Sequence, residues 1–198
     1  MSAVLLTRLK ITDLTALTAL EAGRRMLPEG YTLERIVREE LFLFEPESGV
    51  DPAAFEKGLH EAIETSNFFV NPNKERFHFL PSGERGERWS PPEGAWGILA
   101  RTRDDTRDEG LRMRLLREHP LPGLGPIRRA RAWWLWTRGP AGDAARDIFY
   151  ERLGPLRGPT QGLLINPHAE ASLKLVGDVA WKDVERFLTE PALQPAAV

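Results

Sequence analysis

The chain has 198 residues, of which 41% are hydrophobic and 28% are charged, a composition typical of folded globular proteins and unlike that of disordered chains. Its formal net charge of −2 gives no general attraction to nucleic acid or to an anionic membrane surface. The absence of cysteine excludes disulfides, thiolate nucleophiles and thiolate metal sites.

The first eighty residues predict an alternation of strands and helices. Residues 3–11 are typical of a strand, and an amphipathic helix follows Asp13, which can cap it. Residues 31–45 predict either one long strand or a pair of strands, and Asp51-Pro52 opens a second helix. Residues 67–80, "NFFVNPNKERFHFL", end this part with an apolar triplet, an Asn-Pro step and an alternating strand. With the hairpin alternative, the order is the βαββαβ of ferredoxin-like units.

The next fourteen residues, "PSGERGERWSPPEG", are rich in proline, glycine and charge, as linkers and exposed loops are. The same order of elements then returns. Strands are expected at 95–104 and 127–138, helices at 105–119 and 142–156, and a last strand in "GLLINPHAEASLKLV", residues 162–176. The Asn-Pro steps at Asn71-Pro72 and Asn166-Pro167 are 95 residues apart, and "LFLF" aligns near "WWLW" at an offset of 94. The sequence therefore predicts an internal duplication.

We accordingly expect an α+β protein with two ferredoxin-like repeats that pack as an intramolecular pseudo-dimer, each covering the apolar open face of the other's sheet. The repeats are assigned to residues 1–80 and 95–177, with a linker at 81–94. Residues 178–198 are expected to form a helix capped by Asp178 and a frayed tail.

The plan of "LLTRLKI", an amphipathic helix, apolar strands, a second helix and an Asn-Pro step resembles the small S subunit of phosphoribosylformylglycinamidine synthase, an enzyme of purine biosynthesis. That family's Asp-Pro-x-Gly turn after the first strand is missing here. The resemblance implies a non-catalytic accessory subunit that dimerises through its sheets and holds synthetase and glutaminase subunits together. A tandem of two such units would act as one dimer, whether or not both repeats keep the same role.

Common signatures of nucleotide-binding proteins, hydrolases and zinc enzymes are absent from the sequence, and the four histidines lack ligand spacing. We therefore expect no cofactor and no metal, and an enzyme is less expected than a scaffold or interaction protein. The alternative is a small-molecule-binding regulatory module with its ligand between the repeats. Candidate surface residues for a partner or ligand are Asn71, Pro72, Asn166, Pro167, Arg128, Arg129, Arg131, Trp133 and Trp136.

The arginines in "GLGPIRRAR" are the best anion-site candidate, although the favoured explanation is a solvated strand entry whose arginines pair with acidic neighbours. The tryptophans can be core residues or an aromatic platform for a ligand. Each Asn-Pro step can be a purely structural joint into the last strand, or it can shape a surface that a partner recognises. No apolar run approaches the roughly 18 residues of a membrane span. A cytoplasmic location, no nucleic-acid partner and some homo-oligomerisation are expected.

Overall fold

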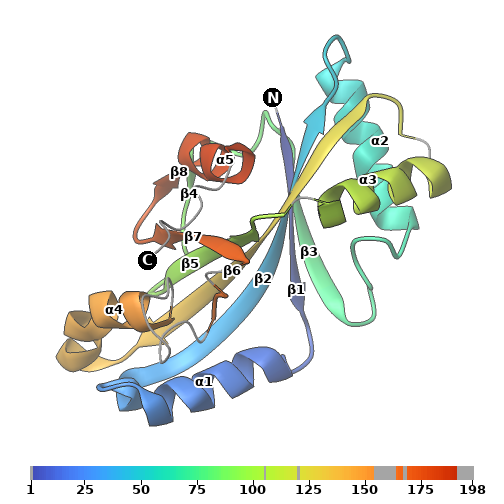
Figure 1. Ribbon diagram of the computed structural model, residues 1–198. Helices are drawn as coiled ribbons and strands as arrows, with labels where there is room; N and C mark the ends of the chain where they lie inside the picture. The colour runs from blue at the N-terminus through green and yellow to red at the C-terminus, as the bar shows by residue number, and fades with distance from the viewer. Residues whose placement is uncertain (1, 105, 120, 154–163, 167–168, 191–198) are drawn as a thin grey trace.

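The computed structural model describes residues 2–104, 106–119, 121–153, 164–166 and 169–190, shown in Figure 1. The strands are β1 (Ala3–Leu9), β2 (Leu33–Pro46), β3 (Glu75–Leu80), β4 (Arg88–Trp89), β5 (Trp96–Thr102), β6 (Leu124–Thr137), β7 (Glu170–Leu175) and β8 (Val179–Ala180). The helices are α1 (Leu14–Met26), α2 (Pro52–Thr65), α3 (Thr106–Glu118), α4 (Gly139–Leu153) and α5 (Trp181–Thr189), with a 3-10 turn η1 (Gly30–Thr32).

Six strands form one antiparallel sheet in the order β3-β1-β2-β6-β5-β7, which confirms the α+β class. Of the two alternatives for the second strand region, the structure has the single long strand. This strand, β2, stays continuous because it pairs with β6 from Leu33 opposite Thr137 to Pro46 opposite Leu124. Each half of the chain therefore has the order βαβαβ rather than βαββαβ.

Two of the predicted helix starts are confirmed in atomic detail. The carboxylate of Asp13 accepts hydrogen bonds from the backbone N–H groups of Thr15 and Ala16, and that of Asp51 accepts one from Ala54. These bonds satisfy donors that the first turn of a helix leaves without intrahelical partners. Helices α1 and α2 therefore begin where the sequence places them.

The two halves occupy equivalent places in the sheet, although the sequence offset between them is not uniform. The last strands β3 and β7 begin at Glu75 and Glu170, which agrees with the offset of 95 between the Asn-Pro steps. The long strands β2 and β6 begin at Leu33 and Leu124 and both have 14 residues, so their offset is 91 rather than the expected 94. Phe42 therefore corresponds to Trp133, and "LFLF" to "AWWL".

Helices α1 to α4 cover one face of the sheet but are exchanged between the halves. One core cluster contains residues of α2 and α3, and another contains residues of α1 and α4. We call the first the α2/α3 lobe and the second the α1/α4 lobe; Figure 1 shows them at opposite ends of the long strands. Phe42 and Phe44 of β2 belong to the α2/α3 lobe, whereas Ile36 of the same strand belongs to the α1/α4 lobe. Each lobe is therefore built from both halves of the chain.

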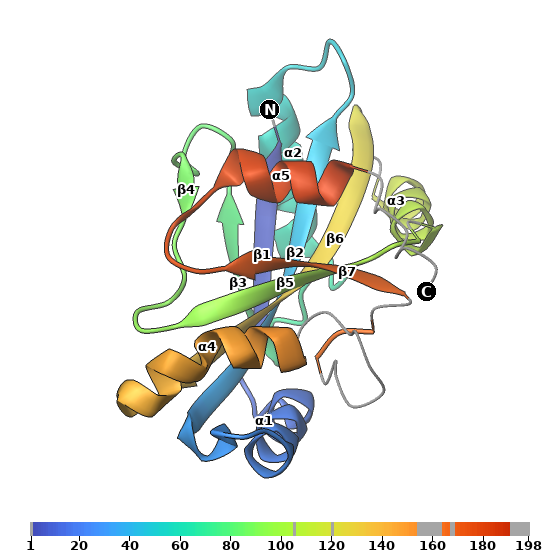
Figure 2. The ribbon, with the colours of Figure 1, turned by 60° about the vertical axis from the view of Figure 1, so that its left-hand side comes forward.

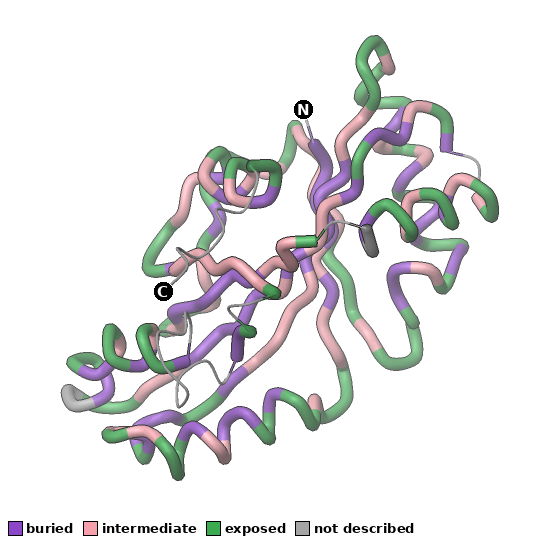
Figure 3. Tube along the Cα trace, viewed as in Figure 1, coloured by how far each residue is buried: buried purple, intermediate pink, exposed green. Residues whose placement is uncertain are grey.

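The other face of the sheet is covered by the linker and the C-terminal helix. The sequence-based expectation that the two repeats cover each other's open faces is wrong, because the repeats lie edge to edge in one sheet. Helix α5 lies across this face in Figure 2, and its Trp181 stacks on Trp89 of β4 with ring centroids 5.1 Å apart. Buried Val184 and Leu188 of α5 join sheet residues in a third core cluster, so the purple segments in Figure 3 occur on both faces.

The linker and tail also depart from their sequence-based description. Residues 81–94 contain β4, which pairs with β8 as a two-stranded ribbon instead of forming a featureless connection. Arg85 of this segment contacts Glu185 of α5 with a nitrogen–oxygen distance of 2.6 Å. The helix begins after Ala180, with no side-chain cap, so Asp178 does not cap it.

The centre of the sheet carries one cross-strand pair of opposite charge. Glu40 of β2 is the register partner of Arg131 of β6, and Arg131 is also the position that corresponds to Glu40 at the offset of 91. The pair therefore lies on the approximate two-fold axis that relates the halves. The Arg131 Nε atom donates to Oε1 of Glu40 at 3.0 Å. Two identical units would place like charges here, which is unfavourable in a cross-strand pair.

Candidate functional site

The asparagines of the two Asn-Pro steps accept the same pair of backbone hydrogen bonds. The carbonyl oxygen of Asn71 accepts hydrogen bonds from the N–H groups of Lys74 and Glu75, at 2.9 and 2.7 Å. In the second half, the carbonyl of Asn166 accepts from Ala169 and Glu170, at 3.0 and 2.6 Å. In both turns the carbonyl of Asn closes the chain before the last strand begins, and we therefore favour the structural interpretation of this joint.

A glutamate four residues after each asparagine completes the turn, and sequence reasoning missed it. The backbone N–H of Asn71 donates to Oε2 of Glu75 at 2.7 Å, and that of Asn166 donates to Oε2 of Glu170 at 2.8 Å. The repeated signal is thus Asn-Pro-x-x-Glu, visible in "NPNKE" and "NPHAE". Exposed Pro72 offers its carbonyl to Nζ of Lys10 at 2.8 Å, whereas Pro167 lies outside the described residues.

The three arginines of "GLGPIRRAR" do not converge on one site. Successive residues of a strand point to opposite faces, so Arg128 lies on the α5 face while Arg129 and Arg131 lie on the face of helices α1 to α4. Arg128 is 3.7 Å from Glu45 and Arg129 is 3.8 Å from Asp108, with Arg131 bonded to Glu40. Pairing with acidic neighbours, the other explanation of these arginines, accounts for their positions.

The two candidate tryptophans differ in their surroundings. Trp133 is 3% exposed and packs in the α1/α4 lobe, as the core interpretation predicts. Its rim, with Arg131, borders an open pocket of about 480 Å³ against α1. Trp136 is half-buried; its Nε1 donates to the carbonyl of Glu93, and the guanidinium of Arg35 lies 3.6 Å from its ring centroid. No single aromatic platform results from the two.

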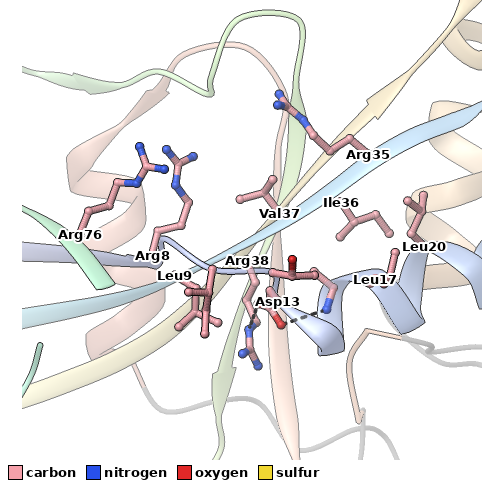
Figure 4. A pocket seen from close by; sticks show the side chains of 13 residues that line it. Arg8, Leu9, Asp13, Leu17, Leu20, Arg35, Ile36, Val37, Arg38 and Arg76 are labelled. Atoms are coloured by element: carbon pink, nitrogen blue, oxygen red, sulfur yellow. Dashed lines mark hydrogen bonds and ion pairs between the residues drawn. The ribbon is translucent and has the colours of Figure 1, made fainter. Parts of the chain in front are cut away.

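A different pocket, of about 380 Å³, lies where β1 ends and the longer β2 continues beside α1, and Figure 4 shows it. We call it the arginine pocket. Its polar residues are Arg8, Arg35, Arg38, Arg76, Asp13 and Thr12, and its apolar walls are Leu9, Ile11, Ala16, Leu17, Leu20, Ile36 and Val37. Four arginines against one aspartate make this a cationic region in a chain whose net charge is −2.

The arginines of the pocket have different partners. Arg38 points toward α1, where its Nε donates to Oδ2 of Asp13 at 2.9 Å. Arg8 is 3.6 Å from Glu39, a weak ion pair, and is the register partner of Arg76. Within the described part of the chain, no ion pair joins Arg76 or Arg35 to a carboxylate. Two like charges thus lie directly opposite each other on neighbouring strands, and the acidic neighbour Glu39 lies on β2, beyond Arg8 as seen from Arg76.

Sequence reasoning did not single out this pocket, because its residues come from four separate segments. Arg8, Arg35 and Arg76 lie in β1, β2 and β3, and each is an ordinary polar position in an alternating strand pattern. Only the pairing of β1 with β3 brings Arg8 opposite Arg76. No spacing motif in the sequence could have indicated this arrangement.

Metal and membrane signals are also weak in the described residues. No group of three or more histidine, aspartate or glutamate side chains among them could hold a metal ion. His60 stacks on Phe79 with ring centroids 5.1 Å apart, which is a packing role. In the same part of the chain, no helix has the length and apolar character needed to cross a bilayer.

Comparison with known proteins adds no relative: no family model, no curated protein and no solved structure matches this chain.

Proposed function

We propose that the protein is a non-catalytic scaffold built from two fused units like the small S subunit of phosphoribosylformylglycinamidine synthase. The observation that carries the proposal is the pairing of β2 with β6, which joins the two halves edge to edge in one sheet. Members of that family dimerise through their sheets, and a fused dimer would need such a junction inside one chain. The Asn-Pro turns, repeated in the same structural position, add support.

We further propose that each lobe is a ferredoxin-like unit in exchanged form. A ferredoxin-like sheet needs four strands in the order last, first, third, second. In the α2/α3 lobe, β3, β1 and the end of β2 would supply three of them, and the start of β6 the fourth. The start of β2 would do the same for the α1/α4 lobe. The hairpin of the ordinary unit would then be opened into one long strand, as in domain swapping.

The exchange of helices supports this interpretation. Helix α1 precedes the start of β2 and packs with α4, while α3 precedes the start of β6 and packs with α2. Each opened hairpin would therefore carry its preceding helix into the other lobe. A chain of this kind depends on both halves and presents a rigid, continuous sheet, which suits a scaffold better than a mobile enzyme.

The proposed role can be tested in cells that express the chain. Depletion of the protein should lower glutamine-dependent synthesis of formylglycinamidine ribonucleotide and leave synthesis with added ammonia unchanged, because a scaffold that joins glutaminase to synthetase matters only for ammonia transfer. The tagged chain should also recover both subunits from extract containing glutamine and Mg-ADP. Equal activity with and without the protein, or turnover by the purified chain alone, would contradict the proposal.

A further inference from the structure

We propose that the arginine pocket binds a phosphomonoester that carries an apolar group, with the phosphate between Arg8 and Arg76. This inference goes beyond the scaffold role and does not depend on it. It also differs in place from the ligand site that the sequence predicts near Trp133, Trp136 and Arg128.

The first argument is electrostatic. Arg8 and Arg76 are register partners on β1 and β3, and their side chains lie on the same face of the sheet, as Figure 4 shows. Like charges in directly opposed positions destabilise a sheet. The single ion pair of Arg8 with Glu39, at 3.6 Å, compensates one of these two charges only in part. An anion held between the two guanidinium groups would turn the repulsion into an attraction.

The second argument comes from the equivalent place in the other half. The position opposite Arg101 of β5 is Ala171 of β7, so the like-charged pair is absent there. Arg101 instead donates to the backbone carbonyl of Glu190 and lies 5.4 Å from the ring of Phe187, at the end of α5. One half thus uses its arginine to hold the C-terminal helix, whereas Arg8 and Arg76 line an open pocket.

The third argument concerns the class of ligand. Guanidinium groups form forked hydrogen bonds that match phosphate oxygens, and a pair of arginines suits a doubly charged phosphate better than a singly charged carboxylate. The pocket volume of about 380 Å³ exceeds what a free phosphate fills and falls in the range of small-molecule sites. Val37, on the same face of the sheet as the two arginines, offers an apolar wall for the rest of the ligand, while Leu9 and Ile36 line the part of the pocket that faces α1.

Arg35 lies farther along the pocket and would contact only the longer ligands. Its guanidinium is stacked on the ring of Trp136, which holds it in place without neutralising its charge. A ligand longer than a simple phosphomonoester would reach it. Because Trp136 is in direct contact with Arg35, tryptophan fluorescence gives an optical readout of ligands that extend to this end.

The test uses the full chain at low salt and three small probes: phenyl phosphate, inorganic phosphate and phenol. Phenyl phosphate should raise the melting temperature of the chain. In calorimetry it should bind about tenfold more tightly than inorganic phosphate, or better, and phenol should have no effect. Adenosine 5′-monophosphate, a longer phosphomonoester, should also bind and should change the tryptophan emission. Equal binding of phenol and phenyl phosphate, or no protection by any of the phosphates, would overturn the proposal.

Two variants separate binding from folding. Arg76→Gln should weaken phenyl phosphate binding at least about tenfold, while Arg25→Gln, at an exposed position at the end of α1, should leave it unchanged. Without ligand, Arg76→Gln should melt at the same temperature or up to about 3 °C higher, because it removes a cross-strand repulsion. Unchanged binding in Arg76→Gln, or a marked loss of its ligand-free stability, would show that Arg76 serves the fold and would overturn the proposal.

Discussion

The two halves of the chain share their turns and differ where they face each other and where they face solvent. Both halves close the last strand with the same Asn-Pro-x-x-Glu turn, and both use a helix arginine to bind the first two carbonyls of the long strand. Arg24 donates to the carbonyls of Leu33 and Glu34, while Arg112 donates to those of Leu124 and Gly125.

This second likeness does not depend on sequence position. Helices α1 and α3 begin at Leu14 and Thr106, so Arg24 corresponds to Leu116 and Arg112 to Leu20, one helical turn away. Both arginines satisfy the same structural requirement. The start of each long strand extends past its neighbour, and its carbonyls would otherwise lack partners. Common backbone geometry is thus retained while the residues that satisfy it change position.

The differences lie in side chains that only one half needs. Glu40 and Arg131 occupy corresponding positions yet have opposite charge, and Val4 opposite Leu43 is matched by Gly97 opposite Trp134. The Glu40–Arg131 pair requires two units of different sequence, since two copies of either unit would place like charges on the axis. The comparison therefore predicts that the halves are complementary and no longer interchangeable.

The largest effect should come from separating the halves. Residues 1–94 and 95–198, expressed apart, should each lack cooperative unfolding, because each lobe draws a helix and strand from both halves. Mixed in equal amounts, they should form a one-to-one complex in sedimentation analysis and recover a single thermal transition. Cooperative unfolding of either half as a monomer would contradict the exchanged arrangement.

The next largest effect should come from replacing the Gly97–Trp134 pair of the second half by the residues of its counterpart in the first half, Val4–Leu43. A Cβ atom on Gly97 would lie 2.6 Å from the Trp134 ring, so Gly97→Val should destabilise the chain by about 3 kcal/mol in urea unfolding. Trp134→Leu removes that ring, which is 1% exposed, and should cost a similar amount alone.

The double variant copies the pair Val4–Leu43 of the first half. It should be more stable than the sum of the single effects predicts, by about 1–3 kcal/mol, because valine can then fill space that the indole leaves. Simple additivity would mean that the two residues do not exchange volume across the strands. An Ala19→Gly variant, in the α1/α4 lobe, is a suitable independent control because Ala19 lies outside the core cluster of Trp134.

The helix starts, the turns and the long strands show how far the sequence could predict the fold. Asp13, Asp51 and the Asn-Pro steps act through neighbours a few residues away, so the helix starts and the turns were predictable. The continuity of β2 was not, because it depends on β6, a strand about ninety residues later. A hairpin and a long strand have the same local pattern, and only tertiary pairing decides between them.

The sequence did not indicate the arginine pocket for a related reason. Arg128 and Arg129 are adjacent in sequence but lie on opposite faces of the sheet, whereas Arg8 and Arg76 are 68 residues apart and lie opposite each other on neighbouring strands. Strand alternation divides neighbouring side chains, and sheet register brings distant ones together. The tryptophans were interpreted better: Trp133 and Trp134 are core residues because both faces of the central sheet are covered.

A smaller effect is expected from reversing the charge on the two-fold axis. Glu40→Arg places two arginines opposite each other and should destabilise the chain by about 1 kcal/mol, since the pair is only partly buried. Adding Arg131→Glu restores an opposite-charge pair in reversed order and should recover most of that loss. If the double variant were no more stable than Glu40→Arg alone, direct pairing across the axis would be refuted.

The smallest effect should be the same in both halves. Glu75→Gln and Glu170→Gln each keep the shape of the side chain but weaken the charge-assisted hydrogen bond from the asparagine N–H. Each should lower the free energy of unfolding by about 0.5–1 kcal/mol. Glu61→Gln, on the exposed face of α2, is the matched control and should change it by less than about 0.5 kcal/mol. Similar losses at the two turns would establish that they act alike. A large loss at one turn and none at the other would mean that only one turn stabilises its strand, and that the likeness between the halves is geometric without being energetic.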